Sequence, residues 1–298
     1  MALKSALDLG LAEAIHHHGG SATLPQIVAR VTLHPSKTLH LRRLMRVLAT
    51  TGVFSVQHSS PSGDSSSEPV YKLTPMSALL VGPRCNLVPL TALVVDPAIV
   101  TPFFELGKWF QRGLPGPCIF EQTHGQTLWE HANGDAAFDA LINDGMLSDS
   151  HFIMDIAIKE CAHLFQGISS LVDVGGGLGA VVQAISMAFP SVKCSVLELD
   201  HVVSKAPSDT QVCYVGGDMF ESVPPANAMF LKEAAYITNL ANIVLVIQVD
   251  QVLRTVIDAL RVLIAFTIVI TTFFSATADH VQQYFFVFSR VIHFCKNN

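Results

Sequence analysis

The stretch Leu171–Ala180 reads Leu-Val-Asp-Val-Gly-Gly-Gly-Leu-Gly-Ala and decides the fold of the chain. The apolar run from Ile168 to Val174 predicts a short buried strand, and a helical pattern of apolar residues occupies 181–189. Four glycines stand between them: Gly175, Gly176, Gly177 and Gly179. Glycines allow a tight turn and a close approach of a ligand to the backbone, because they carry no Cβ atom. Strand, glycine turn and helix predict the first unit of a doubly wound α/β domain with a site for a nucleotide-like ligand.

An acidic residue stands at the distance that such a site requires. A second apolar stretch, 194–197, predicts another strand and ends in Glu198, about 20 residues after the glycines. A carboxylate at this point can accept hydrogen bonds from the two hydroxyls of a ribose. Further short strands are predicted over 212–215 and 228–231, and the last one ends at Lys232.

Composition excludes several classes of protein. The chain has 298 residues, of which 50% are apolar and only 14% are charged, so it is not a disordered protein. Its net charge of −6 argues against a general nucleic-acid binder. The cysteines have no zinc or redox spacing, and we expect them to be reduced thiols of a cytoplasmic protein. Met1 opens directly into a helical pattern, so no signal peptide is predicted.

The first hundred residues predict a mainly helical domain. Helices are expected over 2–15, 24–31 and 35–51, and two short strands, 53–57 and 71–74, flank a polar loop. Three helices followed by a hairpin are typical of a winged helix. Such a domain can bind DNA through its third helix, or it can serve protein contacts. The acidic balance of the whole chain favours protein contacts, with three arginines of the third helix in solvent: Arg42, Arg43 and Arg46.

Four segments together resemble the plant S-adenosylmethionine-dependent O-methyltransferases of the caffeate and flavonoid type: 2–20, 171–180, 196–203 and 215–232. They include Asp-Val-Gly-Gly-Gly, the acidic Glu198 in a Leu-x-Leu-x-His-Val-Val context, and Gly-Gly-Asp-Met-Phe. The resemblance implies an α/β protein with a winged-helix dimerisation domain over 1–100. It further implies linker helices and a Rossmann-like, S-adenosylmethionine-binding domain over 101–232. The Rossmann-like domain is expected to be incomplete at its C-terminus, and residues 233–298 diverge from the family.

The resemblance also implies roles for individual residues. Gly175 would lie under the methionine part of the cofactor, and Glu198 would hold the ribose hydroxyls where the family usually has aspartate. The adenine would lie between Asp218, as a hydrogen-bonding group, and Met219, as an apolar contact. The remaining cofactor contacts would be Lys232 and Ser150. Met219 can alternatively be simple core, and Ser150 an ordinary helix residue. The substrate-side helices would contribute Trp129, Asn143 and Met146, and no metal is expected.

One departure from the family concerns catalysis. Tyr236 stands where the family has the histidine that removes the proton from the substrate hydroxyl. A phenol with an ordinary pKa of about 10 is a poor base near neutrality. The resemblance therefore implies an inactive relative of enzymes that methylate small phenols. The alternative is a non-catalytic partner that dimerises with intact relatives, and a homodimer is the other expected assembly.

The last sixty residues carry a second departure. We expect residues 239–298 to resemble nothing in the family, and the resemblance implies a start that is shorter than in other members. The segment 262–278 contains no charged residue. Its length is close to the length that a helix needs to span a membrane. Its threonines, β-branched and aromatic residues fit a buried strand instead, or a segment without an evolved structural role. We therefore expect no membrane association and no nucleic-acid partner.

Overall fold

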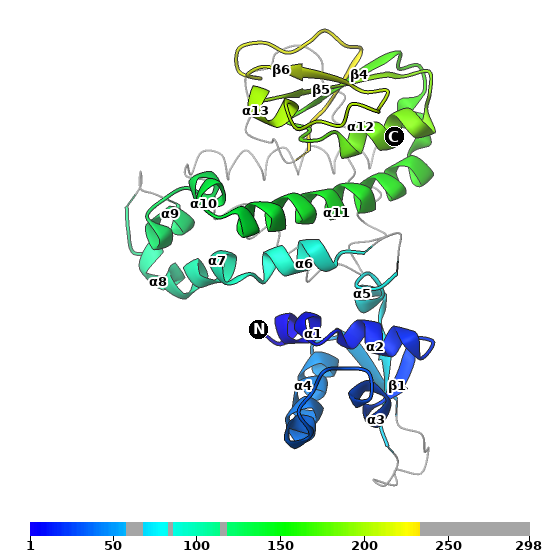
Figure 1. Ribbon diagram of the computed structural model, residues 1–298, viewed down its shortest axis with the longest axis vertical. Coiled ribbons are helices and arrows are strands. Elements are labelled where there is room, and N and C mark those ends of the chain that lie inside the picture. The colour runs from blue at the N-terminus through cyan, green and yellow to red at the C-terminus, as the bar shows by residue number, and fades with distance from the viewer. Residues whose placement is uncertain (58–67, 83–85, 114–117, 233–298) are drawn as a thin grey trace, which may run out of the picture. The chain divides into compact units, whose positions relative to one another are not determined.

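The computed structural model describes residues 1–57, 68–82, 86–113 and 118–232 (Figure 1). These residues fall into two compact units, Met1–Ser148 and 149–232. The first unit contains α1 (Ala2–Asp8), α2 (Leu11–His17), β1 (Ser21–Thr23), α3 (Leu24–Val28), η1 (Pro35–Lys37), α4 (Thr38–Thr50), β2 (Phe54–Gln57), β3 (Val70–Leu73), α5 (Pro75–Ala78), α6 (Val88–Val94), α7 (Pro97–Val100), η2 (Thr101–Glu105), α8 (Leu106–Trp109), α9 (Ile119–His124) and α10 (Leu128–Gly134). The long helix α11 (Ala136–Glu160) runs through the division. The second unit continues with η3 (Ala162–Phe165), β4 (Ser170–Val174), α12 (Ala180–Ala188), β5 (Lys193–Glu198), α13 (Asp200–Val203), β6 (Cys213–Gly216) and β7 (Ala228–Phe230).

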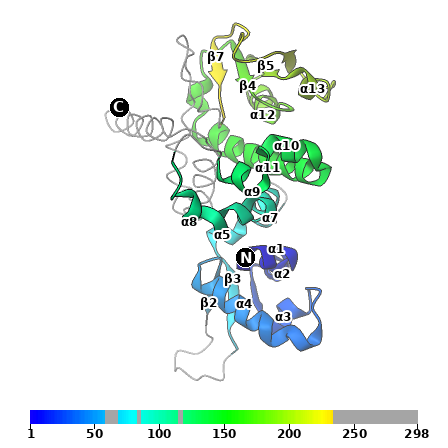
Figure 2. The ribbon, with the colours of Figure 1, turned by 90° about the vertical axis from the view of Figure 1, so that its left-hand side faces the viewer.

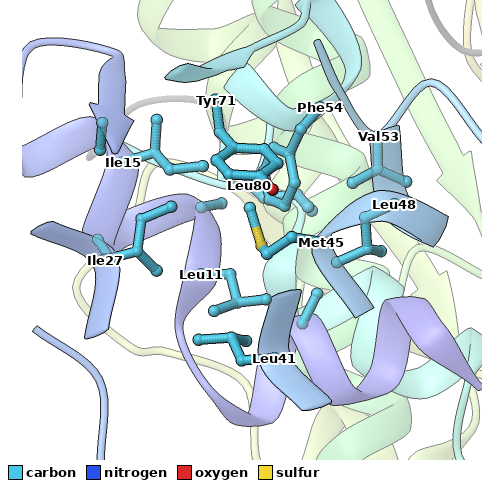
Figure 3. Close-up of a cluster of buried hydrophobic side chains, with 14 of the residues drawn as sticks. Leu11, Ile15, Ile27, Leu41, Met45, Leu48, Val53, Phe54, Tyr71 and Leu80 are labelled. Carbon is cyan, nitrogen blue, oxygen red and sulfur yellow. The ribbon is translucent and has the colours of Figure 1, made fainter. Parts of the chain in front are cut away.

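The N-terminal part of the first unit is the predicted winged helix. Strands β2 and β3 pair antiparallel, as expected of the hairpin, and β1 adds to the other edge of β3. Figure 3 shows the core under this sheet, in which Met45 and Tyr71 belong to the same cluster of buried side chains. Met45 and Leu11 are fully buried, which places α4 and α2 on the same core.

Two details of this domain differ from the sequence prediction. The helix expected over 2–15 is two helices, because Gly10 between them has a φ of 63°, a left-handed conformation that ends α1. The strand β1 was not expected. Its last residue, Thr23, is also the N-cap of α3, and its backbone N–H donates to Gln26 Oε1 at 2.8 Å.

The remainder of the first unit is helical. Phe120 of α9 and Phe138 of α11 belong to one buried cluster, with Leu93 of α6. Gly145 of α11 lies against α6: a Cβ atom there would come within 3.0 Å of Leu93 Cδ2. The absent side chain lets the two helices approach closely.

The second unit is built on a parallel sheet with the strand order β6-β5-β4-β7. Helix α12 connects β4 to β5, as the glycine motif predicts, and packs Val182 and Ile185 into the core beneath the sheet. Figure 2 shows β7 beside β4, on the side away from β5. The strand order reverses between β4 and β7, and this is the point at which doubly wound sheets bind their ligands. The α/β, Rossmann-like fold is confirmed.

Two sequence predictions concern other parts of the chain. Tyr236 and the apolar segment 262–278 lie outside the described residues. Within the described ranges no single helix has the length and apolar composition of a membrane span. One bent pair, Val88–Val94 with Pro97–Trp109, meets the length and composition criteria only when taken together.

Candidate functional site

The glycine turn after β4 leaves open backbone at the carboxyl edge of the sheet. Gly175 has a φ of 70° and donates its N–H to Leu197 O at 2.9 Å, which fixes the turn to β5. Gly177 has a φ of 56°. At either glycine an added Cβ atom would meet no atom of the described residues within 4 Å, so these residues leave the backbone of the turn uncovered.

The end of the turn is closed by Tyr214 of β6. Its hydroxyl donates to Leu178 O at 2.9 Å and accepts from Gln183 Nε2 at 3.0 Å. A Cβ atom on Gly179 would lie 2.7 Å from this hydroxyl, and Gly179 also has a φ of 80°. Glycine is therefore required here both by the backbone conformation and by the neighbouring tyrosine.

Glu198 ends β5 beside the turn, as expected. Its Oε2 accepts from the Gly177 N–H and its Oε1 from the Leu199 N–H, both at 3.0 Å. Each carboxylate oxygen has a second lone pair, so Glu198 can accept further hydrogen bonds from a ligand. The side chain is half-buried and lies against the turn that follows β4.

Asp218 and Met219 follow β6 in a turn. Asp218 is exposed, and its Oδ1 accepts from the Phe220 N–H at 2.8 Å. Met219 is half-buried and packs against an apolar cluster that includes Val174 and Leu197. The packing of Met219 agrees with the core alternative and leaves part of its side chain for a ligand.

Lys232, directly after β7, is tied to α11. Its ammonium lies 2.7 Å from Asp149 Oδ2 and donates to Ser150 Oγ at 3.0 Å. The side chains of Lys232 and Asp149 are only 17% and 15% exposed, so this ion pair is largely withdrawn from water. The structure thus brings together two predicted residues, Lys232 and Ser150, and adds Asp149, which was not predicted.

A second unpredicted acid lies under the turn. Asp173 of β4 is 2% exposed, and its Oδ2 has no hydrogen-bond partner among the described residues. Burial raises the pKa of its carboxyl to about 7, while the Lys232 ammonium lowers this pKa and the Glu198 carboxylate raises it. A charged residue in an otherwise apolar strand was the sequence signal for it.

The predicted substrate-side residues belong to the first unit. Trp129 of α10 is 67% exposed, and Asn143 of α11 is also exposed. Met146 is half-buried against the cluster that contains Phe138 and Ile142. Among the described residues, no three His, Cys, Asp or Glu side chains come together as a metal site.

The sequence profile of the O-methyltransferase domain matches residues 103–282, and that of the O-methyltransferase dimerisation domain matches residues 1–83. The chain belongs to the O-methyltransferase family. The range matched by the O-methyltransferase domain extends past residue 232, the last residue of the segments that resemble the family by their motifs. The matched range includes residues 239–282, which are part of the segment 239–298 that was expected to resemble nothing in the family.

Relatives of this O-methyltransferase family member include plant proteins. It is 60% identical to the O-methyltransferase ZRP4 of Zea mays, over 79% of this chain and 66% of that protein. It is 47% identical to a 5-pentadecatrienyl resorcinol O-methyltransferase of Sorghum bicolor, over 78% of this chain and 66% of that protein. The chain spans slightly less than two thirds of the length of these relatives.

Solved structures share the fold. The mitomycin 7-O-methyltransferase MmcR matches with a TM-score of 0.54 and 26% identity, over 78% of this chain and 66% of that one. The methyltransferase CalO1, solved in its SAH-bound form, matches with a TM-score of 0.60 and 24% identity, over 77% and 65% of the two chains.

Proposed function

We propose that the second unit binds S-adenosylmethionine at the carboxyl ends of β4, β5 and β7. The observation that carries this proposal is the pairing of Glu198 with Gly177 across the turn. It places a carboxylate with spare lone pairs beside open glycine backbone at the switch in strand order. The SAH-bound form of CalO1, which shares the fold, supports the same ligand class. When bound, the cofactor supplies an activated methyl group.

The contacts expected of this chain follow its geometry. Glu198 accepts from the ribose hydroxyls, and Gly175 lies under the methionine part. Asp218 and the free part of Met219 contact the adenine. Lys232 and Ser150, already bonded to each other, complete the site. Each of these roles is part of the proposal.

Replacement of Glu198 tests the cofactor site. Glu198→Ala removes the acceptor for the ribose hydroxyls and should weaken S-adenosylmethionine binding by about 1–3 kcal/mol, as measured by calorimetry. Glu198→Asp keeps a carboxylate and should retain most of the affinity. The exposed Glu221, replaced by alanine, is the control and should change nothing. Unchanged affinity in Glu198→Ala would remove this residue from the site.

We further propose that the substrate class is a small phenol and that the chain does not transfer the methyl group at a detectable rate. The substrate would contact Met146, Asn143 and Trp129, as the family resemblance implies. A positioned base typically contributes about 10²–10⁴-fold to such a proton transfer. Tyr236 takes the place of the base in the sequence, and the resemblance supplies no acid to orient a replacement.

The activity proposal is tested by radiolabelled methyl transfer to a panel of phenols. We expect no product from the unmodified chain, and none from Tyr236→His alone, because an unoriented imidazole does not restore the lost geometry. An intact O-methyltransferase in the same assay shows that the panel is adequate. Turnover by the unmodified chain would show that another residue acts as the base.

The match to the dimerisation domain over residues 1–83 favours a second function, pairing through the winged helix. We propose that the chain forms a homodimer, or a heterodimer with an intact relative. Light scattering after size exclusion gives the state of the chain alone, and co-expression with a tagged relative tests the heterodimer. A monomer that fails to co-purify would contradict both assemblies.

A further inference from the structure

The buried carboxylate of Asp173 contacts the glycine turn from below. A Cβ atom on Gly176 would lie 2.5 Å from Asp173 Oδ2, so the carboxylate and the ligand-facing backbone are separated by one glycine. Asp173 is 2% exposed, and its Oδ2 has no hydrogen-bond partner among the described residues. An ionised carboxylate with an unsatisfied buried oxygen is costly, which favours the neutral form.

Charged and titratable groups of neighbouring elements interact with Asp173, directly or through Lys232. Glu198 and Cys194 belong to β5, Lys232 follows β7, and α11 contributes Asp149 through its ion pair with Lys232. Burial raises the pKa of the Cys194 thiol to about 11 and Asp173 adds to the rise, so this group stays neutral. Lys232 is the cation that acts on Asp173, but its ammonium is ion-paired with Asp149 at 2.7 Å and donates a hydrogen bond to Ser150 at 3.0 Å.

We propose that Asp173 holds a proton in the ligand-free protein and releases it to solvent when the positive charge of S-adenosylmethionine binds above the glycine turn. The inference rests on the proposed cofactor function. It assigns to Asp173 a positioning role in which the ionised carboxylate attracts the cation through one layer of backbone. No bond is made or broken apart from the loss of this proton.

Linkage gives the expected size of the effect. Burial raises the carboxyl pKa to about 7, so close to half of the free molecules carry the proton at pH 7. A ligand cation near the carboxylate favours the charged form and lowers this pKa. Binding should therefore release about half a proton at pH 7, and affinity should rise roughly tenfold between pH 6 and pH 8.

The test is calorimetry of the full chain with S-adenosylmethionine at pH 7 in two buffers of different ionisation enthalpy, phosphate and Tris. The slope of the observed binding enthalpy against the ionisation enthalpy of the buffer gives the number of protons released on binding. We expect the unmodified chain to release about half a proton more than Asp173→Asn, whose amide cannot ionise. The α-amino group of the cofactor is common to both proteins, so its own proton cancels. The exposed Asp209, replaced by asparagine, is the matched control and should behave like the unmodified chain.

The outcomes separate this inference from the function on which it rests. No binding by the unmodified chain contradicts the cofactor function, and the inference with it. If the unmodified chain and Asp173→Asn both bind and release the same number of protons, the inference alone is contradicted. S-adenosylhomocysteine, which lacks the sulfonium charge, should release less than S-adenosylmethionine, and an equal release would overturn the assignment to that charge.

A direct titration makes the test independent of the folding of Asp173→Asn. The ¹³C chemical shift of the Asp173 carboxyl carbon reports its protonation in the unmodified chain. We expect a midpoint near pH 7 without ligand and a midpoint lowered by at least one pH unit with saturating S-adenosylmethionine. A carboxyl that is already ionised at pH 6 in the ligand-free protein would overturn the proposal.

Discussion

At the residue scale, Gly179 shows how closely the turn is fitted to its neighbours. Gly179→Ala combines a left-handed backbone, which costs about 1–2 kcal/mol for a residue with a Cβ atom, with a collision against the Tyr214 hydroxyl 2.7 Å away. We expect the free energy of unfolding to fall by more than about 2 kcal/mol, as measured by hydrogen exchange of the β4 amides.

Gly177→Ala is the matched control, since Gly177 also has a left-handed backbone and no atom of the described residues lies within 4 Å of the new Cβ atom. It should lose only the backbone contribution of about 1–2 kcal/mol. Tyr214→Phe, which removes the hydroxyl, should relieve part of the loss in Gly179→Ala. Equal losses in the two glycine variants would show that the tyrosine adapts without cost.

A site residue could be predicted from the sequence where its interactions are local along the chain. The glycine turn and Glu198 follow from a strand–turn–helix pattern and a fixed spacing, and the structure has Gly177 and Glu198 in contact. The contact between Lys232 and Ser150 joins residues that are 82 positions apart, so neither motif spacing nor apolar periodicity predicts it. The burial of Asp173 depends in the same way on strands β5 and β7, which the chain adds later.

At the scale of elements, Gly145 limits the packing of α11 on α6. Alanine generally stabilises a helix interior by about 0.5–1 kcal/mol relative to glycine. At Gly145 the new Cβ atom would lie 3.0 Å from Leu93 Cδ2 and 3.3 Å from Leu93 Cβ, and overpacking typically costs about 1–3 kcal/mol. We expect Gly145→Ala to lower the free energy of unfolding by about 1 kcal/mol, as measured by urea denaturation.

The control for this prediction is the exposed Gly134 at the end of α10, where a Cβ atom meets nothing within 4 Å in the part of the chain that the structure describes. Gly134→Ala should leave stability unchanged or raise it slightly. In the Leu93→Ala background, which is itself less stable because it loses a buried side chain, Gly145→Ala should cost less than it does in the unmodified chain. A stabilising Gly145→Ala would mean that Leu93 moves aside and that helix propensity decides the sign.

Most elements were predictable because each has its own apolar period. The central strands β4, β5, β6 and β7 lie within one or two residues of the predicted segments. The errors arose where a single backbone conformation outweighs the period. Gly10, with its left-handed φ, divides a continuous apolar pattern into α1 and α2. The three residues of β1 are too few to show alternation, and their pairing with β3 is a tertiary contact.

At the scale of the whole molecule, a division into two parts could be predicted from the sequence, but the residue at which the chain divides could not. The helix α11 is continuous from Ala136 to Glu160, while the core against which it packs changes. Phe138 and Ile142 belong to the cluster of α6 and α9, whereas Met154 and Ala157 belong to the core of the parallel sheet. The structure divides at 148/149 inside this helix, and the predicted domain limits at 100 and 232 stay predictions.

Asp173 also makes the stability of the whole molecule depend on pH. Burial raises the pKa of its carboxyl from 3.8 to about 7 in the folded protein, so the folded state binds this proton more tightly than the unfolded state. The contribution of this proton to the free energy of unfolding is therefore fully present below about pH 4. It is lost as the pH rises to about 7, and it does not change further at higher pH. The loss amounts to about 4 kcal/mol, since one pKa unit corresponds to about 1.4 kcal/mol.

Asp173→Asn should remove this dependence, because an amide of nearly the same shape does not ionise. Relative to the unmodified chain, the variant should gain about 4 kcal/mol in free energy of unfolding between pH 4 and pH 8, as measured by hydrogen exchange of the β4 and β5 amides. Other titrating groups are common to both proteins and cancel in the difference, and Asp209→Asn provides the same comparison for an exposed acid. A difference between the two proteins that stays constant from pH 4 to pH 8 would mean that Asp173 is ionised throughout. Its charge would then have to be balanced by Lys232, at the expense of the ion pair that holds Lys232 to Asp149.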